Sequence, residues 1–112
     1  MPKDYRQVIE SEEQGWSLTE KGQGTLTLTK TKATDKYHLV YNLDATCTEP
    51  YEIEIITGTK FLWQMKFSAG YTLLRQFRPG LRGLLGTSID VTLKTSSAGT
   101  SFLNVSGWSG IK

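Results

Sequence analysis

Hydrophobic and polar residues alternate along most of the chain from Trp16 onward. In the stretch GTLTLTKTK, Leu26 and Leu28 point to one side and the intervening threonines point to the other. A period of two puts successive side chains on opposite faces of a β-strand, whereas an α-helix requires a period of 3.6. No helical pattern of about 10 to 15 residues lies between these runs. The pattern therefore predicts an all-β chain.

Five later segments show the same alternation, and each predicts a strand with one apolar face. The apolar faces are Tyr37, Leu39, Tyr41 and Leu43 in KYHLVYNLDA; Tyr51, Ile53 and Ile55 in YEIEII; Phe61, Trp63, Met65 and Phe67 in KFLWQMKF; Ile89, Val91 and Leu93 in SIDVTLKT; and Leu103 and Val105 in TSFLNVSGW. We expect the apolar residues of KFLWQMKF to form a stripe in the core. In YEIEII, we expect Glu52 and Glu54 to lie on a solvated face.

Turn-forming residues separate these segments at intervals of about 8 to 12 residues, which is typical of sandwiches and barrels. The segment FRPGLRGLLGTS interrupts the rhythm, because its one proline and three glycines are unfavourable in a central strand. It predicts a longer loop whose Leu81, Leu84 and Leu85 must find burial. About eight strands result, and two packed sheets would use them without long open edges. We therefore predict an antiparallel β-sandwich, jelly-roll-like, over residues 15–112.

The first 14 residues, MPKDYRQVIESEEQ, are mostly polar. They predict an N-terminal arm that lies on the domain or reaches a neighbouring molecule, and a frayed terminus is an equal alternative. If the arm makes a contact, its interface candidates are Tyr5, Val8 and Ile9.

Length and charge narrow the possible functions. A chain of 112 residues fits one domain and needs neither disulfides nor metal to fold. Its formal net charge of +2 is too small and too evenly scattered to indicate a nucleic-acid footprint. Acidic residues gather within residues 10–13 and basic ones at Arg75, Arg78 and Arg82. This asymmetry favours solvated faces over an edge-to-edge contact between molecules.

Cysteine content and hydropathy bear on the compartment. The single Cys47 excludes an internal disulfide framework and leaves no second cysteine for a metal cluster, which is compatible with a reducing compartment. The N-terminus has no apolar signal-peptide core, and no run is long enough to span a bilayer. We therefore expect no membrane partner and no nucleic-acid partner.

Catalytic chemistry has little support in the sequence. His38 is the only histidine and no nucleophile motif accompanies it, so a structural or surface role is favoured over pairing with Cys47. Glu52 and Glu54 are neighbours on one strand face, and no acidic cluster has the spacing of a calcium loop. The glycines of GLRGLLG are not followed by the Lys-Ser or Lys-Thr pair of a phosphate-binding loop. We expect no catalytic residues, no metal ligands and no cofactor.

Aromatic residues make up 11% of the chain, so a surface that stacks on sugars or bases has to be considered. The aromatic residues of KFLWQMKF are expected in the core stripe, which accounts for them without a ligand. Trp16 and Trp108 remain as a possible ligand platform. The face rich in threonine and serine suits either solvent or an identical subunit.

Three stretches, taken in their order and spacing, resemble small proteins of tailed-bacteriophage virions. The stretches are Lys36-Tyr37-His38-Leu39-Val40; Gly58-Thr59-Lys60-Phe61-Leu62-Trp63 with Ala69-Gly70; and Pro79-Gly80-Leu81-Arg82-Gly83, Ile89-Asp90-Val91-Thr92-Leu93, Ser97-Ala98-Gly99 and Asn104-Val105-Ser106-Gly107-Trp108. The resemblance covers about residues 34–109. This chain departs from the family pattern at the inserted Gly80 and at Trp108, where tyrosine is more common. The motifs are structural and bring no catalytic residues.

The resemblance implies a non-enzymatic virion protein, in the simplest role a head decoration or cement protein that binds and stabilises the capsid shell. It implies a β-rich homotrimer, assembled in the host cytoplasm, with the major capsid protein or another virion protein as partner. The arm and the loop near residues 75–85 would make the contacts. The interface candidates in the loop region are Arg75, Arg78, Leu81, Arg82, Leu84 and Leu85. The alternative is a carbohydrate- or receptor-binding module of a phage tail fibre.

Overall fold

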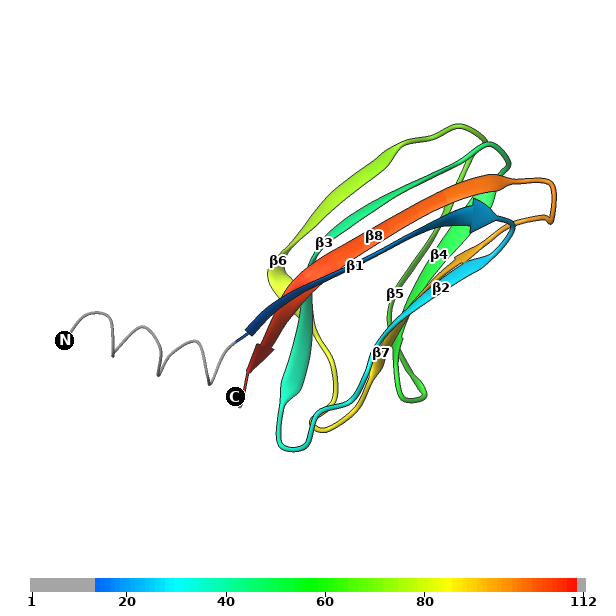
Figure 1. The fold of residues 1–112 in the computed structure, drawn as a ribbon. Helices are drawn as coiled ribbons and strands as arrows, with labels where there is room; N and C mark the ends of the chain where they lie inside the picture. The colour runs from blue at the N-terminus through cyan, green and yellow to red at the C-terminus, as the bar shows by residue number, and fades with distance from the viewer. Residues whose placement is uncertain (1–13, 111–112) are drawn as a thin grey trace.

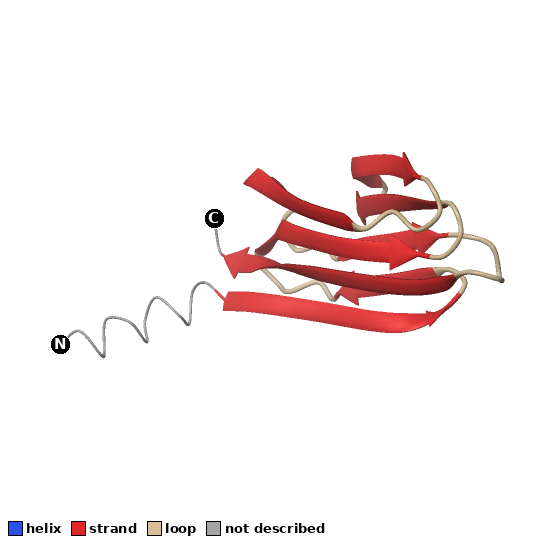
Figure 2. Cartoon of the chain, turned by 90° about the horizontal axis from the view of Figure 1, so that it is seen from above, coloured by secondary structure: helices blue, strands red, loops and turns tan. Residues whose placement is uncertain are grey.

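The computed structural model describes residues 14–110, and this part of the chain contains strands and loops but no helix (Figures 1 and 2). Its strands are β1 (Gln14–Gln23), β2 (Leu26–Lys30), β3 (Tyr37–Cys47), β4 (Tyr51–Thr57), β5 (Lys60–Phe67), β6 (Leu73–Arg82), β7 (Ile89–Lys94) and β8 (Thr100–Gly110). β1 starts at Gln14, the last residue of the predicted arm, and the rest of the arm lies outside the described residues.

The strands form two four-stranded antiparallel sheets that enclose one core. Sheet A has the order β1-β8-β3-β6, and sheet B has the order β2-β7-β4-β5. The chain passes from one sheet to the other at every connection except the β4–β5 hairpin, and β1 lies beside β8. This order of eight strands is that of a double-sheet jelly roll. The predicted antiparallel, jelly-roll-like sandwich is confirmed.

The core consists of the apolar side chains on the inner faces of both sheets. Side chains with no exposed surface include Val40, Leu43, Ile53, Ile55, Leu93, Leu103 and Val105. In β2, β7 and β8, burial alternates between successive residues as the sequence predicts. These side chains come from both sheets, so burying them holds the two layers together.

A β-bulge changes the faces of β3. The register of this strand with both neighbours shifts between Val40 and Asn42. Before the bulge His38 and Val40 are buried, and after it Leu43 is buried. The predicted common face of KYHLVYNLDA is therefore wrong, since Tyr41 is 36% exposed and Leu43 is fully buried. An extra residue in a strand breaks the two-residue period at that point.

The core stripe predicted for β5 is wrong at two of its four positions. Trp63 and Phe67 pack against the core, but Phe61 is 55% exposed and Met65 is 45% exposed. β5 is an edge strand of sheet B, so its side chains have a neighbouring strand on one side only. A register shift between β4 and β5 also displaces the start of β5 from the two-residue period.

The loop predicted from FRPGLRGLLGTS is wrong in its first half, because β6 continues to Arg82. β6 is an edge strand of sheet A and pairs with β3. Its register shifts so that residues 77–80 lie opposite the single residue Tyr41. Pro79 therefore occupies an edge irregularity, where proline is tolerated in a sheet. The expected burial holds for Leu81, which is half-buried and packs against the core.

One end of the sandwich carries the start of β1 and the end of β8. The β2–β3 loop (31–36), the β4–β5 turn (58–59) and the β6–β7 loop (83–88) lie at this same end (Figure 1). We refer to it as the terminal end.

Candidate functional site

Hydrogen bonds fix the β6–β7 loop, residues 83–88, to the rest of the terminal end. The amides of Gly83 and Gly86 each donate to a carbonyl of residues 36–38 at 2.8 Å. The buried hydroxyl of Thr57 in β4 accepts from one backbone amide of the loop at 3.0 Å and donates to one of its carbonyls at 3.2 Å. The loop therefore has a defined backbone conformation although it lies on the surface.

This anchored loop exposes two leucines. Leu84 is 45% exposed and Leu85 is 50% exposed, so their expected burial is wrong. The reason is that the backbone of the short loop faces β3 and β4 and directs these side chains outward. Phe61, at the start of β5, is a third large apolar side chain exposed at the terminal end. Exposed apolar side chains on a backbone fixed by hydrogen bonds are typical of a protein contact site.

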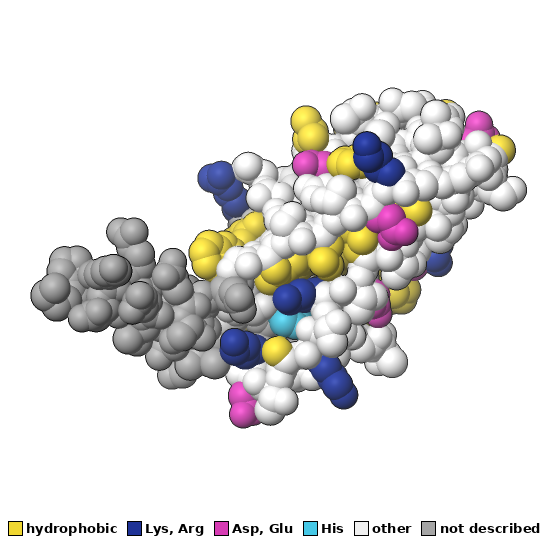
Figure 3. Space-filling view, in the orientation of Figure 1, with side chains coloured by type: hydrophobic (Ala, Val, Ile, Leu, Met, Phe, Trp, Pro, Cys, Tyr) yellow, Lys and Arg dark blue, Asp and Glu magenta, His cyan; other side chains and the backbone are white. Residues whose placement is uncertain are grey.

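Basic residues lie at the same end of the sandwich as these apolar groups. Around the terminal end lie Lys32, Lys36, Lys60 and Arg82, with Asp35 as an acidic neighbour. Lysine and arginine side chains are visible around this end in Figure 3. The guanidinium of Arg82 lies 4.0 Å from the ring centroid of Tyr37, which positions its charge beside the loop.

The three arginines that are neighbours in the sequence pattern do not form one patch. Arg75, Arg78 and Arg82 are spread along the edge strand β6. Arg75 lies near the aromatic rings of Trp63 and Phe77, at 5.9 and 5.5 Å from their centroids. Only Arg82 belongs to the terminal end. The arm candidates Tyr5, Val8 and Ile9 lie outside the described residues.

The two tryptophans predicted as a ligand platform lie on opposite faces of sheet A. Trp16 pairs with Gly107, packs against the core and has its ring 6.2 Å from that of His38. Trp108 pairs with Gly15 on the outer face and is 47% exposed. A single ligand cannot stack on both rings.

A shallow groove crosses the outer face of sheet A, and the sequence patterns did not reveal it. Three adjoining hollows form this groove, and they share lining residues. The residues that define it are Tyr41, Asn42, Asp44, Gln76, Asn104, Ser106 and Trp108. We refer to it as the sheet A groove. The alternating polar residues of β3 and β8 were its signal, but only the pairing of these distant strands brings them together.

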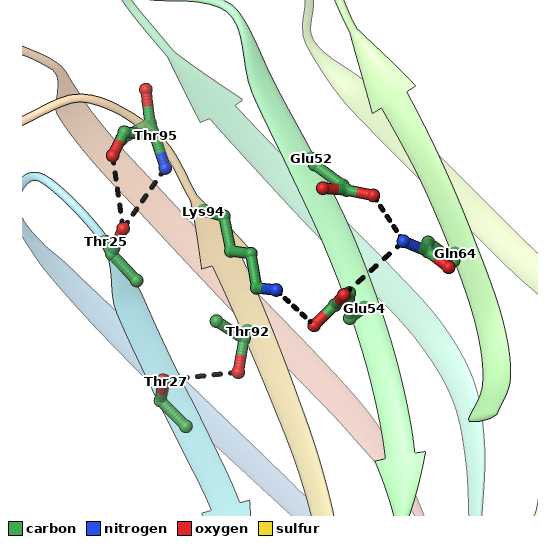
Figure 4. A network of polar contacts seen from close by, with 8 residues as sticks. All are labelled: Thr25, Thr27, Glu52, Glu54, Gln64, Thr92, Lys94 and Thr95. Carbon is green, nitrogen blue, oxygen red and sulfur yellow. Dashed lines mark hydrogen bonds and ion pairs between the residues drawn. The ribbon is translucent and has the colours of Figure 1, made fainter. Parts of the chain in front are cut away.

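A network of polar contacts covers the outer face of sheet B (Figure 4). Lys94 Nζ lies 2.9 Å from Glu54 Oε1, and the side-chain amide of Gln64 donates to both Glu52 and Glu54. The expected solvation is wrong for Glu54, whose exposed fraction is 7%. Its position on β4, between β5 and β7, gives it neighbours on both sides.

The threonine-rich face of β2 also has its partners within the sheet. The hydroxyls of Thr27 and Thr92 lie 3.2 Å apart, and the hydroxyl of Thr29 donates to Asp90 at 2.7 Å. Thr25 Oγ1 accepts from a backbone amide after β7 at 3.1 Å. These hydroxyls stabilise the pairing of β2 with β7.

His38 and Cys47 each have their own hydrogen-bond partners. His38 Nε2 lies 2.8 Å from the carbonyl of Thr31, so this nitrogen donates, and the hydroxyl of Ser109 donates to Nδ1 at 2.5 Å. The Cys47 thiol lies 3.5 Å from each of two hydroxyls at the other end of the sandwich. Both residues therefore stabilise strand contacts.

The part of the chain that the structure describes contains no group of three or more His, Cys, Asp and Glu side chains that could hold a metal ion. It also contains no helix with the length and hydropathy needed to cross a membrane.

No protein-family model and no curated protein sequence matches this chain. Its fold is similar to the CBM36-1 domain of a multidomain xylanase from the hindgut metagenome of Trinervitermes trinervoides, at 7% identity and a TM-score of 0.43, covering 80% of this chain and 74% of that one. A carbohydrate-binding module CBM36 in complex with calcium and xylotriose shows 5% identity and a TM-score of 0.39, with 84% and 87% covered. A de novo designed double-stranded β-helix shows 10% identity and a TM-score of 0.37, with 83% and 97% covered. These similarities concern strand arrangement and carry no inference about ligands.

Proposed function

We propose that the protein is a non-catalytic structural component of a tailed-bacteriophage virion, a head decoration protein that binds the assembled capsid shell. Two observations support this proposal. One is the sequence resemblance over about residues 34–109. The other, which carries the structural argument, is the anchored β6–β7 loop with its exposed leucines.

The loop suits a binding role on physical grounds. Leu84 and Leu85 are each about half exposed, so a partner that covers them removes apolar surface from water and gains roughly 25 cal/mol per Å². The backbone of the loop is already fixed by hydrogen bonds, so little conformational freedom is lost on binding. The basic residues around it, Arg82 among them, would steer an acidic partner surface toward the loop.

We propose further that the protein acts as a homotrimer. A loop with two leucines is a small contact, and three copies held together would bind the shell far more firmly than one, because the second and third contacts form at high effective concentration. Native mass spectrometry of the purified protein should give a mass three times that of one chain. A monomer at micromolar concentration would contradict this part of the proposal.

Capsid binding is tested by co-sedimentation with emptied heads of the phage that encodes the protein. The double variant Leu84→Ser, Leu85→Ser should sediment with the heads much less than the unaltered protein. Met65→Ser is the matched control, because Met65 is as exposed as Leu84, at 45%, but lies on β5 away from the loop. This control should sediment normally.

The location of the protein decides between virion roles. Immunogold labelling of intact virions should mark the heads. Absence of the protein from purified virions by mass spectrometry would overturn the proposal altogether. Labelling of tail fibres would overturn the decoration role and favour the receptor-binding alternative.

A further inference from the structure

Polar side chains form the centre of the sheet A groove. Asn42 and Asp44 of β3 lie opposite Ser106 and Asn104 of β8, and all four are on the outer face of the two central strands. The edge strands β1 and β6 border the groove on either side. The floor of the groove is therefore made of the two central strands of sheet A, which pair with each other on both sides of the bulge at Tyr41.

Two aromatic side chains are fixed at the end of the groove nearest the terminal end. The ring of Tyr41 lies against Gly80 of β6, where an added Cβ would be 3.1 Å from Tyr41 Cε1. The indole of Trp108 reaches over Gly15 of β1, where an added Cβ would be 4.0 Å from Trp108 Cζ3. Each ring thus rests on a glycine of an edge strand. Tyr41 nevertheless stays 36% exposed and Trp108 stays 47% exposed. Rings held in this way lose little freedom when a ligand stacks on them.

Hydrogen bonds orient the polar floor. Thr19 Oγ1 donates to Asn104 Oδ1 at 2.6 Å, and Asn104 Nδ2 donates to Asp44 Oδ2 at 3.4 Å. Asn42 Nδ2 donates to the hydroxyl of Ser106 at 3.4 Å. The described residues provide no partner for the remaining oxygens of Asp44 and Asn42. These oxygens can accept hydrogen bonds from a ligand in the groove.

This combination of groups selects a class of ligand. Sugars have C–H faces that pack on aromatic rings and hydroxyls that donate to carboxylate and amide oxygens. A nucleic acid would meet the carboxylate of Asp44 in the floor, and an apolar peptide or lipid would bury polar groups without partners. Arg78 at the margin, whose guanidinium donates to Gln76 Oε1 at 3.0 Å, offsets the charge of Asp44, so an uncharged ligand fits best.

We propose that the sheet A groove binds an oligosaccharide of neutral sugars. Trp108 and Tyr41 stack on sugar rings, and Asp44 and Asn42 accept hydrogen bonds from sugar hydroxyls. This site is distinct from the β6–β7 loop that contacts the capsid, and it does not depend on which virion structure carries the protein.

The test uses the full-length chain and defined probes. Calorimetric titrations are performed with cellohexaose, maltohexaose and mannohexaose, and with polygalacturonic acid oligomers and single-stranded DNA as charged probes. The variants are Trp108→Ala, Tyr41→Ala and Asp44→Ala. Phe61→Ala is the matched control, because Phe61 is an aromatic residue on the other sheet and is 55% exposed, against 47% for Trp108. We expect at least one neutral hexaose to bind, and Trp108→Ala to weaken its binding by about tenfold or more.

Each outcome decides the proposal. Neutral-sugar binding that Trp108→Ala and Asp44→Ala both weaken, and that Phe61→Ala leaves unchanged, supports it. The proposal is overturned if none of the three hexaoses binds at about 1 mM, if Trp108→Ala binds as well as the unaltered chain, or if only the charged probes bind. Thermal melting shows whether each variant is folded, and only the variants that are folded are compared with the unaltered chain. Trp108→Ala should still sediment with emptied heads, so failure of sugar binding is distinguishable from failure of capsid binding.

Discussion

At the scale of single residues, Gly107 in β8 allows the backbone of sheet A and an interior indole to approach closely. A Cβ added at Gly107 would overlap the carbonyl oxygen of Leu39 in β3 and lie 2.8 Å from Trp16 Cζ2. Because glycine lacks this atom, the indole of Trp16 occupies the inner side of the sheet at that point. The position therefore supports both a central strand pairing and the packing of β1.

Gly107→Ala should destabilise the protein by about 3 kcal/mol or more, because the new methyl group meets backbone that cannot move independently. Gly15→Ala is the control: it lies in the adjacent strand, its added Cβ would meet no atom closer than 3.9 Å, and it should cost about 1 kcal/mol or less. Urea unfolding followed by circular dichroism measures both. Equal midpoints for the two variants would contradict the packing argument.

His38 is a second residue whose neighbours determine its behaviour. Burial lowers its pKa from the usual 6.5, the hydrogen bond to the Thr31 carbonyl raises it, and the charges of Lys30 and Lys36 lower it; the net direction is downward. The folded protein therefore binds a proton at this site less readily than the unfolded chain does. The associated stability is fully present above about pH 6.5 and is lost as pH falls toward the lower pKa of the folded state.

The unfolding free energy should therefore fall between pH 7.5 and pH 5. His38→Gln should show a smaller fall, because the chain has no other histidine to titrate in this range. The readout is the pH dependence of the urea midpoint in each protein, so any constant loss of stability in the variant does not affect the comparison. An equal slope in both proteins would show that His38 is not the group responsible.

At the scale of elements, irregular pairing between strands accounts for most of the positions where alternation mispredicts burial. The alternation of β7 and β8, which have neighbours on both sides, is preserved in the structure. At the edge strand β5 and at the bulge of β3 the expected faces were wrong, and part of the edge strand β6 was expected to be a loop. Alternation reports which residues can share a face, but edges and bulges arise from pairing between strands far apart in the chain.

The sheet A groove was less predictable from the sequence than the fold, for the same reason. Trp108 stood out in the sequence because it is out of phase with the core residues of its strand. Tyr41 was assigned to the core and became accessible only through the bulge beside it. Asn42 and Asn104 drew no attention singly, and the pairing of β3 with β8 places them in one groove. A local sequence pattern can indicate which side chains are exposed. Locating a binding groove also requires knowing which strands pair with each other.

The contact between β4 and β7 gives a prediction at this scale. Lys94→Met leaves the nearly buried carboxylate of Glu54 without its cation and should cost about 1 kcal/mol, a modest value because Lys94 itself is half exposed. Lys66→Met is the control, since Lys66 is exposed opposite Glu52, and its cost should stay within about 0.5 kcal/mol. Adding Glu54→Gln to Lys94→Met should recover part of the loss. Chemical denaturation measures these three variants and the single Glu54→Gln variant, and additive effects at Glu54 and Lys94 would argue against the ion pair.

At the scale of the whole molecule, the two sheets depend on each other. Consecutive strands alternate between them at all connections but one, and the same set of buried side chains fills the space between them. Neither sheet can keep its apolar face from water if the other unfolds. The sandwich is therefore expected to unfold in a single cooperative step, as small domains with one core usually do.

Two single-tryptophan variants test this, because Trp16 lies in sheet A and Trp63 lies in sheet B. The double variant Trp63→Phe, Trp108→Phe reports on sheet A, and Trp16→Phe, Trp108→Phe reports on sheet B. Within each variant, the urea transition seen by tryptophan fluorescence should coincide with that seen by far-ultraviolet circular dichroism. Comparing two probes in the same variant removes any stability change caused by the substitutions. If the fluorescence transition precedes the loss of the circular dichroism signal in either variant, the two sheets unfold separately. Such a result would contradict the expectation that the shared core makes the two sheets unfold together.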